Sequence, residues 1–103
     1  MKIAYLMKQE VDPATITPPG VETLRISAGA DGNWDPDDLA RLHDVDALMV
    51  WSEPVTLEVI AAAPHCKIVQ RMGVGYDVLL GCFDAARERG IPCCNVAGAN
   101  KEA

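Results

Sequence analysis

A glycine-bearing segment is the part of this sequence whose residue types and spacing could do chemistry. It reads Arg71-Met72-Gly73-Val74-Gly75-Tyr76-Asp77 and directly follows an apolar run. Glycine lets a backbone approach a ligand closely, and neighbouring backbone N–H groups that point the same way bind anions. The segment therefore predicts a binding loop for a small carboxylate. A tight turn between a strand and a helix is the alternative interpretation of the same glycines.

The segment does not match the dinucleotide-binding fingerprint. A G-x-G-x-x-G pattern that begins at Gly73 needs a glycine at position 78, where the chain has Val78. The fingerprint also follows the first strand of its unit, whereas this segment follows the fourth apolar run. The sequence contains no G-x-S-x-G, P-loop or H-E-x-x-H pattern either. The sequence therefore shows none of these nucleotide-binding or catalytic motifs.

Trp51 and the two histidines are weaker candidates for a functional site. Trp51 ends a predicted strand, where its side chain could line the same cleft or pack in the core. His43 follows an acidic amphipathic segment and His65 follows a helix-stopping proline. Both histidines are predicted to lie on the surface.

The cysteines do not indicate a metal or redox site. Cys66, Cys82, Cys93 and Cys94 contain no C-x-x-C pair, and neither histidine lies at zinc-site spacing from them. Cysteine inside an apolar run behaves as a small buried hydrophobe. We predict free structural thiols, no bound metal, and a reducing compartment.

Five short apolar runs provide the strands that would hold the glycine loop in place. They cover residues 3–7, 21–27, 47–51, 68–72 and 92–96. Runs of this length bounded by turn signals are typical of strands buried in a parallel sheet. The glycine loop leaves the carboxyl end of the fourth run, and ligands bind at that end of the strands in such sheets.

Helix signals separate most of these runs. Asp35 is a good N-cap before Pro36, and Leu39, Leu42 and Val45 form a one-sided apolar stripe behind them. The connection over residues 8–20 differs, because it holds three prolines and a glycine. It predicts a loop with at most one helical turn.

Two further helices follow in the second half of the sequence. Thr56 is predicted to cap one that Pro64 stops near Ala63. The other covers residues 84–89 and ends at Gly90, which suits the position after a helix.

Strands that alternate with helices form right-handed βαβ units and a parallel sheet with helices on both faces. Five strands in about 96 residues match a flavodoxin-like domain with the strand order 2-1-3-4-5. We therefore predict one α/β unit over residues 1–97, with the run at 3–7 inside the sheet and the run at 21–27 at its edge.

Composition excludes several functions. The chain has 103 residues, a net charge of −6 and 50% hydrophobic residues. Half apolar content is typical of a folded domain, and the negative charge argues against a nucleic-acid partner. No apolar run approaches the roughly 18–20 residues of a membrane span. We expect a cytoplasmic protein with no membrane partner.

Several patterns from residue 46 onwards occur together in one known family. They are Val55-Thr56 with the helix LEVIAAAP, the strand and loop KIVQRMGVGYD, the segment DAARERGIPCCNV, and GAN at 98–100. This combination resembles the N-terminal, substrate-domain part of the D-isomer-specific 2-hydroxyacid dehydrogenase family, and residues 1–45 fit it more loosely. The resemblance implies two Rossmann-like domains in tandem, and hydride transfer between NAD(P) and the α-carbon of a 2-hydroxy or 2-keto acid.

The resemblance also implies roles for individual residues. Backbone N–H groups of Val74 and Gly75 would hold the substrate carboxylate, with Tyr76, Arg71 and Trp51 around it. Residues 98–103 would begin the crossover into an NAD(P)-binding domain. The full-length parent would bind NAD or NADP, act on a small 2-hydroxy or 2-keto acid and form a homodimer. A helix from its far C-terminus would pack on the sheet.

The chain departs from the family pattern at three places. It reads YDVLLGCFDAA where family members commonly read YDNVDxxAA. Trp51 stands where many members carry an arginine before the serine, which makes a phosphorylated substrate less favoured. The family's cofactor glycine motif, its carboxylate-binding arginine and its glutamate–histidine pair lie further along the chain than Ala103. The resemblance therefore implies an N-terminal fragment that holds no catalytic and no cofactor-binding residue and is inactive alone. A non-catalytic carboxylate- or protein-binding module of corepressor type is the alternative.

Overall fold

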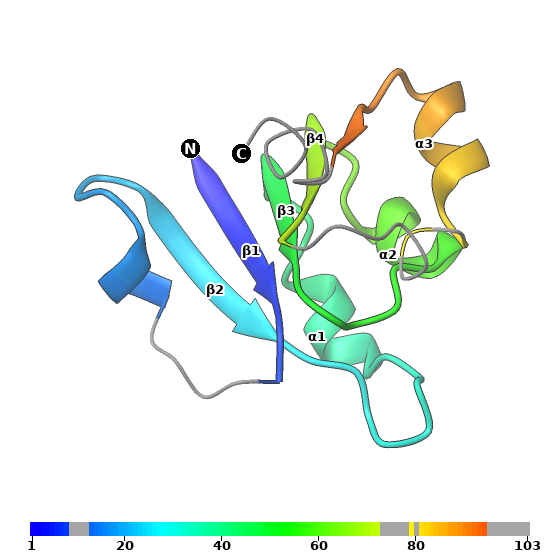
Figure 1. The fold of residues 1–103 in the computed structure, drawn as a ribbon, viewed down its shortest axis with the longest axis horizontal. Coiled ribbons are helices and arrows are strands. Elements are labelled where there is room, and N and C mark those ends of the chain that lie inside the picture. Colours follow the sequence, from blue (N-terminus) through cyan, green and yellow to red (C-terminus); the bar gives the residue numbers. More distant parts are fainter. Residues whose placement is uncertain (9–12, 73–78, 80, 95–103) are drawn as a thin grey trace, which may run out of the picture.

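The strands of the chain form one parallel sheet of five strands in the order β2-β1-β3-β4-β5 (Figure 1). The computed structural model describes residues 1–8, 13–72, 79 and 81–94. The strands are β1 (Lys2–Leu6), β2 (Glu22–Ile26), β3 (Ala47–Val50), β4 (Ile68–Arg71) and β5 (Cys93–Cys94). Every pairing is parallel. The predicted sheet, its strand order, the inner position of β1 and the edge position of β2 are therefore confirmed.

The helical elements between the strands are short. They are the 3-10 turn η1 (Pro13–Ile16) and the helices α1 (Pro36–Ala40), α2 (Leu57–Ala62) and α3 (Phe83–Glu88). Asp35 caps α1 as predicted, because its Oδ1 accepts a hydrogen bond from the N–H of Asp37 at 2.8 Å. Gly90 follows α3 with a φ of 68°, in the left-handed region that glycine adopts without strain.

Two helix predictions need correction. The stripe Leu39, Leu42 and Val45 was expected within one helix, but α1 ends at Ala40 and the chain continues as turns. Leu42 and Val45 are nevertheless fully buried. The spacing of these apolar residues therefore predicts their burial in the core but does not predict the length of the helix. Thr56 occupies the N-cap position of α2, but its side chain makes no capping hydrogen bond. Its hydroxyl is buried without a partner.

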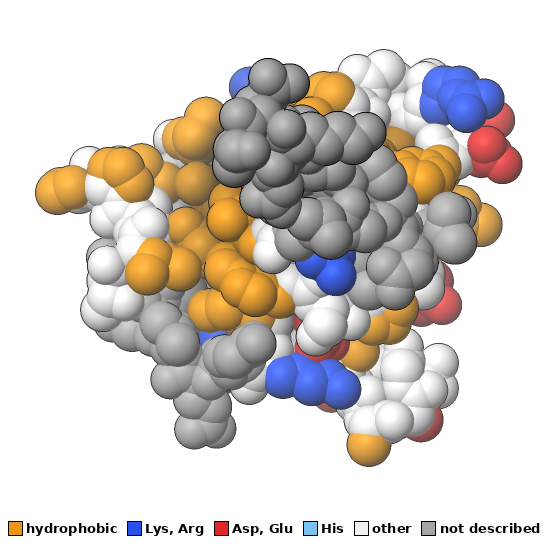
Figure 2. Space-filling view, in the orientation of Figure 1, with side chains coloured by type: hydrophobic (Ala, Val, Ile, Leu, Met, Phe, Trp, Pro, Cys, Tyr) orange, Lys and Arg blue, Asp and Glu red, His pale blue; other side chains and the backbone are white. Residues whose placement is uncertain are grey.

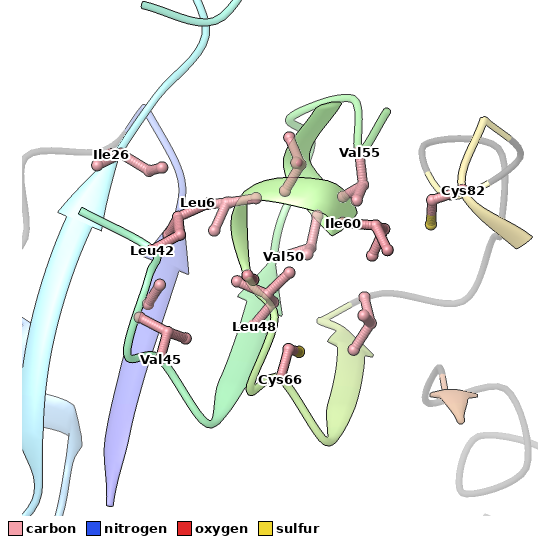
Figure 3. Packing of buried hydrophobic residues seen from close by; sticks show 14 of the residues in the cluster. Leu6, Ile26, Leu42, Val45, Leu48, Val50, Val55, Ile60, Cys66 and Cys82 are labelled. Carbon is pink, nitrogen blue, oxygen red and sulfur yellow. The ribbon is translucent and has the colours of Figure 1, made fainter. Parts of the chain in front are cut away.

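The hydrophobic core lies on one face of the sheet, under α1, α2 and α3. Alternation along β1 separates the faces, because Ala4 and Leu6 belong to the core cluster and Tyr5 does not. Figure 3 shows side chains from the strands meeting those of α2 and of the turn after α1. Strands, helices and the turns beside them all contribute to this core: Leu6, Ile26, Leu42, Val45, Leu48, Val50, Val55, Val59, Ile60, Val69, Cys82 and Ala86.

The second face of the sheet carries no α-helix in the part of the chain that the structure describes. The turn η1 packs beside β2, and the hydroxyls of Tyr5 and Thr17 share a hydrogen bond. Figure 2 shows hydrophobic side chains gathered over β1 on this face. Helices were predicted on both faces of the sheet. On this face the described residues form only the 3-10 turn η1, because the connection after β1 is rich in proline.

Within the described residues, no helix is long and apolar enough to span a membrane. The predicted fifth strand continues into residues 95–96, which lie outside the described residues, as does the predicted crossover over 98–103.

Candidate functional site

The carboxyl ends of the strands meet at one edge of the sheet, because all five strands run the same way. Parallel α/β sheets bind ligands in the crevice outside this edge. Of the predicted site residues, Trp51 directly follows β3 and Arg71 ends β4. Val74, Gly75 and Tyr76 lie outside the described residues. Their placement therefore stays a prediction.

Trp51 and Arg71 are brought to the same edge by backbone pairing. The N–H of Met72 donates to the carbonyl of Val50 at 2.7 Å, and Val50 is the register partner of Arg71. The N–H of Trp51 donates to the carbonyl of Leu6 at 3.2 Å. These bonds extend the sheet by one residue beyond β3 and β4. Arg71 and Met72, which directly precede the glycine segment in sequence, therefore lie at the carboxyl edge.

The side chain of Trp51 lies on the second face of the sheet. Its ring centroid is 5.9 Å from that of Tyr5, with 31° between the ring planes. Aromatic pairs at this distance stabilise each other beyond the area that they bury. Trp51 is half-buried. It is thus neither a core residue nor a free surface residue.

Arg71 belongs to the opposite face. Side chains alternate along a strand, and Val69, two residues before Arg71, lies in the core cluster. Arg71 is half-buried, and its Nε is a buried donor without a partner. Trp51 and Arg71 consequently share an edge without sharing a face of the sheet.

The loop after β3 is clamped by two hydrogen bonds to the segment after β2. The Oε2 atom of Glu53 accepts from the backbone N–H of Ala28 at 2.6 Å. The indole N–H of Trp34 donates to the carbonyl of Pro54 at 3.0 Å. These bonds bridge 25 and 20 residues of sequence, and they hold the loop across the end of β1. The carboxyl edge between β2 and β3 is therefore rigidly built.

Glu53 is the residue that sequence reasoning missed. It is the one charged side chain among the described residues that is fully buried, with 0% of its surface exposed. Glutamate is almost never fully buried unless it is paired. Its place directly after a predicted strand was the only available signal. That signal does not distinguish a buried glutamate from the exposed Ser52 beside it.

Unsatisfied polar atoms gather at this edge. In the described part of the chain, the buried side-chain atoms without a hydrogen-bond partner are Glu53 Oε1, Thr56 Oγ1 and Arg71 Nε. All three belong to the loop after β3 or to the end of β4. Most buried polar groups in native proteins are paired, and a ligand or water is a usual reason for an exception. For these three atoms the described residues supply no hydrogen-bond partner.

The cysteines do not form a second site. All four are free, with Cys66 and Cys82 buried and Cys93 and Cys94 half-buried. Burial raises the pKa of Cys66 and of Cys93, and it raises the pKa of Cys82 to about 12. Thiols with raised pKa values are poor nucleophiles and poor metal ligands near neutral pH. This supports the prediction of structural thiols.

The histidines lie on the surface as predicted. They are also neighbours, because the ring centroids of His43 and His65 are 6.0 Å apart, edge to face. Within the described residues no group of three or more His, Cys, Asp or Glu side chains is placed to hold a metal ion. The pair is therefore a surface contact between the segments that follow α1 and α2.

Two hollows on the surface lie away from the carboxyl edge. One of about 570 Å³ lies between α3 and β5 and is lined by Phe83, Arg87, Gly90, Ile91, Pro92 and Cys93. The other, of about 640 Å³, lies near the amino ends of β1 and β2 beside His43 and Asp44. Neither hollow is lined by Glu53, Thr56 or Arg71. The carboxyl edge therefore remains the candidate site.

Comparison with known proteins places the chain in a family. The D-isomer specific 2-hydroxyacid dehydrogenase, catalytic domain, matches residues 8–103. The chain is 46% identical over 63 residues to the D-3-phosphoglycerate dehydrogenases of Mycobacterium leprae and of Mycobacterium tuberculosis. This stretch is 60% of the chain and 12% of each relative.

A solved structure has the same fold. It is the NAD+-bound 3-phosphoglycerate dehydrogenase of Entamoeba histolytica, which matches 93% of this chain and 32% of its own with a TM-score of 0.73 and 24% identity. The chain thus spans about a third of that protein. The strand order, the sequence patterns around the carboxyl edge and the match over residues 8–103 lead to one conclusion. The chain belongs to the D-isomer specific 2-hydroxyacid dehydrogenase family and forms part of its catalytic domain.

Proposed function

We propose that this chain is the N-terminal part of the substrate domain of an NAD(P)-dependent oxidoreductase. The enzyme would act on the CH–OH group of 2-hydroxy acids and on the corresponding 2-keto acids. The observation that carries this proposal is the family match over residues 8–103. Residues 1–97 would form the substrate domain, and residues 98–103 would begin the crossover into a cofactor domain.

The substrate would bind at the carboxyl edge of the sheet. The N–H groups of Val74 and Gly75 would hold its carboxylate, with Tyr76 beside them. Arg71 and Trp51 would flank this loop. Support comes from Arg71 at the end of β4, which lies at the carboxyl edge and precedes the glycine segment in sequence. The role of this chain would be to bind and orient the 2-keto acid.

We propose that this chain by itself binds no dinucleotide. A dinucleotide site needs a glycine-rich turn from the first strand into a helix. The described part of the connection after β1 holds the 3-10 turn η1 and no such helix. We assign no step of hydride transfer to this chain, and we expect it to be inactive alone. Calorimetry of the 103-residue chain with millimolar NADH should give no saturable heat.

The test of the function uses the full-length protein that carries this chain. Purified protein is mixed with NADH or NADPH and a panel of 2-keto acids, and the loss of reduced cofactor is followed by absorbance. Turnover of at least one 2-keto acid is expected. The full-length protein should have the size of a homodimer in solution. Tight binding of a 2-keto acid without any turnover would instead identify a non-catalytic binding module.

A further inference from the structure

Two exposed histidines meet on the surface of the fold although they are far apart in the sequence. His43 follows α1 and His65 follows α2, and their ring centroids are 6.0 Å apart with 80° between the ring planes. Both histidines lie on the turns that lead into the amino ends of β3 and β4, so the candidate site at the carboxyl edge does not use them. Imidazole is a common ligand of Zn²⁺, Ni²⁺ and Cu²⁺.

The two turns that carry the histidines are held together. The backbone N–H of Lys67 donates to the carbonyl of Asp46 at 2.8 Å, and the side chains of these residues form an ion pair at 3.6 Å. Directly beside the histidines, Leu42 and Cys66 are buried in the same core cluster. This anchoring fixes the backbone under both histidines, while their exposed rings can still rotate about the side-chain torsions.

The separation of the two rings is close to that of a metal-bound pair. Two imidazoles on a tetrahedral ion, with metal–nitrogen bonds of about 2.0–2.1 Å, have ring centroids about 5 Å apart. The observed distance of 6.0 Å is longer than this by about 1 Å. Small rotations of two exposed side chains close such a gap, because the backbone beneath them does not have to move.

A hydrated cation has access to this pair. His43 lines the hollow of about 640 Å³ near the amino ends of β1 and β2. Lys2 and Arg41 line the same hollow, and each forms an ion pair with an aspartate. Glu22 also lines it and forms no ion pair within the part of the chain that the structure describes. The charges around the histidines therefore do not repel a divalent ion.

From these observations we propose that His43 and His65 together bind one divalent transition-metal ion, with water in its remaining coordination positions. The ion belongs to the class that prefers imidazole nitrogen, which includes Zn²⁺ and Ni²⁺. Among the described residues no third side chain of the usual ligand types joins the pair, so the ion exchanges with solution and does not form a closed structural site. It bridges the turns before β3 and β4. The proposal is independent of the proposed oxidoreductase function.

Titration with NiCl₂ followed by proton NMR tests the site in the 103-residue chain, because His43 and His65 are its only histidines. Paramagnetic Ni²⁺ broadens the signals of the imidazoles that bind it. Both histidine signals should broaden together at substoichiometric Ni²⁺, and added diamagnetic Zn²⁺ should restore both. In His43→Gln or His65→Gln, the same broadening of the remaining histidine should need at least about tenfold more Ni²⁺, since the loss of even an outer-shell partner of a ligand weakens metal binding by that factor.

Arg41→Gln is the matched control, because Arg41 is an exposed residue that lines the hollow beside His43 and is not a metal ligand. It should leave the titration unchanged. Broadening of only one histidine signal in the wild-type chain, or no broadening at millimolar Ni²⁺, overturns the proposal. Unchanged broadening of the His65 signal in His43→Gln also overturns it and would place the ion on the neighbouring Cys66 thiol. The wild-type titration needs no variant, so a variant that fails to fold does not remove the test.

Discussion

The guanidinium of Arg89 donates a hydrogen bond to the carbonyl oxygen of Ile60 at 2.6 Å, across 29 residues of sequence. Its second terminal nitrogen donates to the carbonyl of Ala63 at 2.8 Å. These carbonyls lie at the C-terminal end of α2, where a helix carries partial negative charge. Arg89 itself caps the end of α3. One side chain therefore joins the ends of both helices.

Arg89→Ala is expected to lower the free energy of unfolding by about 1.5–3 kcal/mol, because two charge-assisted hydrogen bonds are lost. Arg89→Lys should recover only part of this, since an ammonium lacks the fork that reaches both carbonyls. Urea denaturation of the chain followed by circular dichroism measures the change. Arg87→Ala, on the exposed side of α3, is the control and should have little effect. Equal losses for Arg87 and Arg89 would show that the cap contributes nothing.

The buried thiol of Cys82 makes stability depend on alkaline pH. Burial raises its pKa from 9.0 to about 12, so the unfolded chain releases the proton at lower pH than the folded chain does. The unfolded state then binds fewer protons between about pH 9 and 12, and the free energy of unfolding falls as pH rises. The expected slope is up to about 1.4 kcal/mol per pH unit for this thiol. Urea denaturation between pH 8 and about 11 measures it.

Cys82→Ala is the matching variant, because alanine keeps the site apolar and has no proton to lose. Its stability should fall less steeply over the same pH range than that of the parent chain. Cys66 and Cys93 also have raised pKa values, so some slope should remain. Identical slopes in the two proteins would contradict the assignment of this pH dependence to Cys82.

The second face of the sheet should make the 103-residue chain prone to self-association. Ile3, Met49 and Trp51 are half-buried there, and a contiguous apolar patch usually marks a contact with another segment or protein. The chain is expected to bind a hydrophobic dye and to associate as its concentration rises. Met49→Lys should reduce both, whereas Leu57→Lys, at an exposed leucine on α2, should not. Light scattering and dye fluorescence measure the two effects, and a monomeric chain without dye binding would contradict the expectation.

The elements that sequence predicted well are those with local causes. Asp35 and Pro36 mark a helix start within two residues, and Gly90 marks a helix end by its own backbone preference. The apolar runs give the strands in the same way. The order of the sheet then follows from the handedness of the connections, which is why β2 lies outside β1 as expected.

The features that sequence did not predict depend on distant partners. Glu53 accepts a hydrogen bond from the N–H of Ala28, 25 residues away, and Arg89 donates one to the carbonyl of Ala63, 26 residues away. Thr56 shows the opposite case, since a good capping residue makes no capping bond. The conformational preference of a single residue does not predict contacts that form only when distant segments pack together. The part of the candidate site that they did identify is the edge reached by Trp51 and Arg71.

The glycine loop itself is tested by Gly75→Val in the full-length protein. A side chain at position 75 would restrict the backbone and fill the space that the substrate carboxylate needs. Losing one charge-assisted hydrogen bond costs about 1.5–3 kcal/mol, so kcat/KM should fall about tenfold to a hundredfold. Ala62→Val, a change of similar size in α2, should leave kcat/KM close to that of the parent. Tyr76→Phe should have a smaller effect than Gly75→Val if backbone N–H groups hold the carboxylate. Near-parental kcat/KM in Gly75→Val would mean that the loop is only a turn and that the carboxylate binds elsewhere.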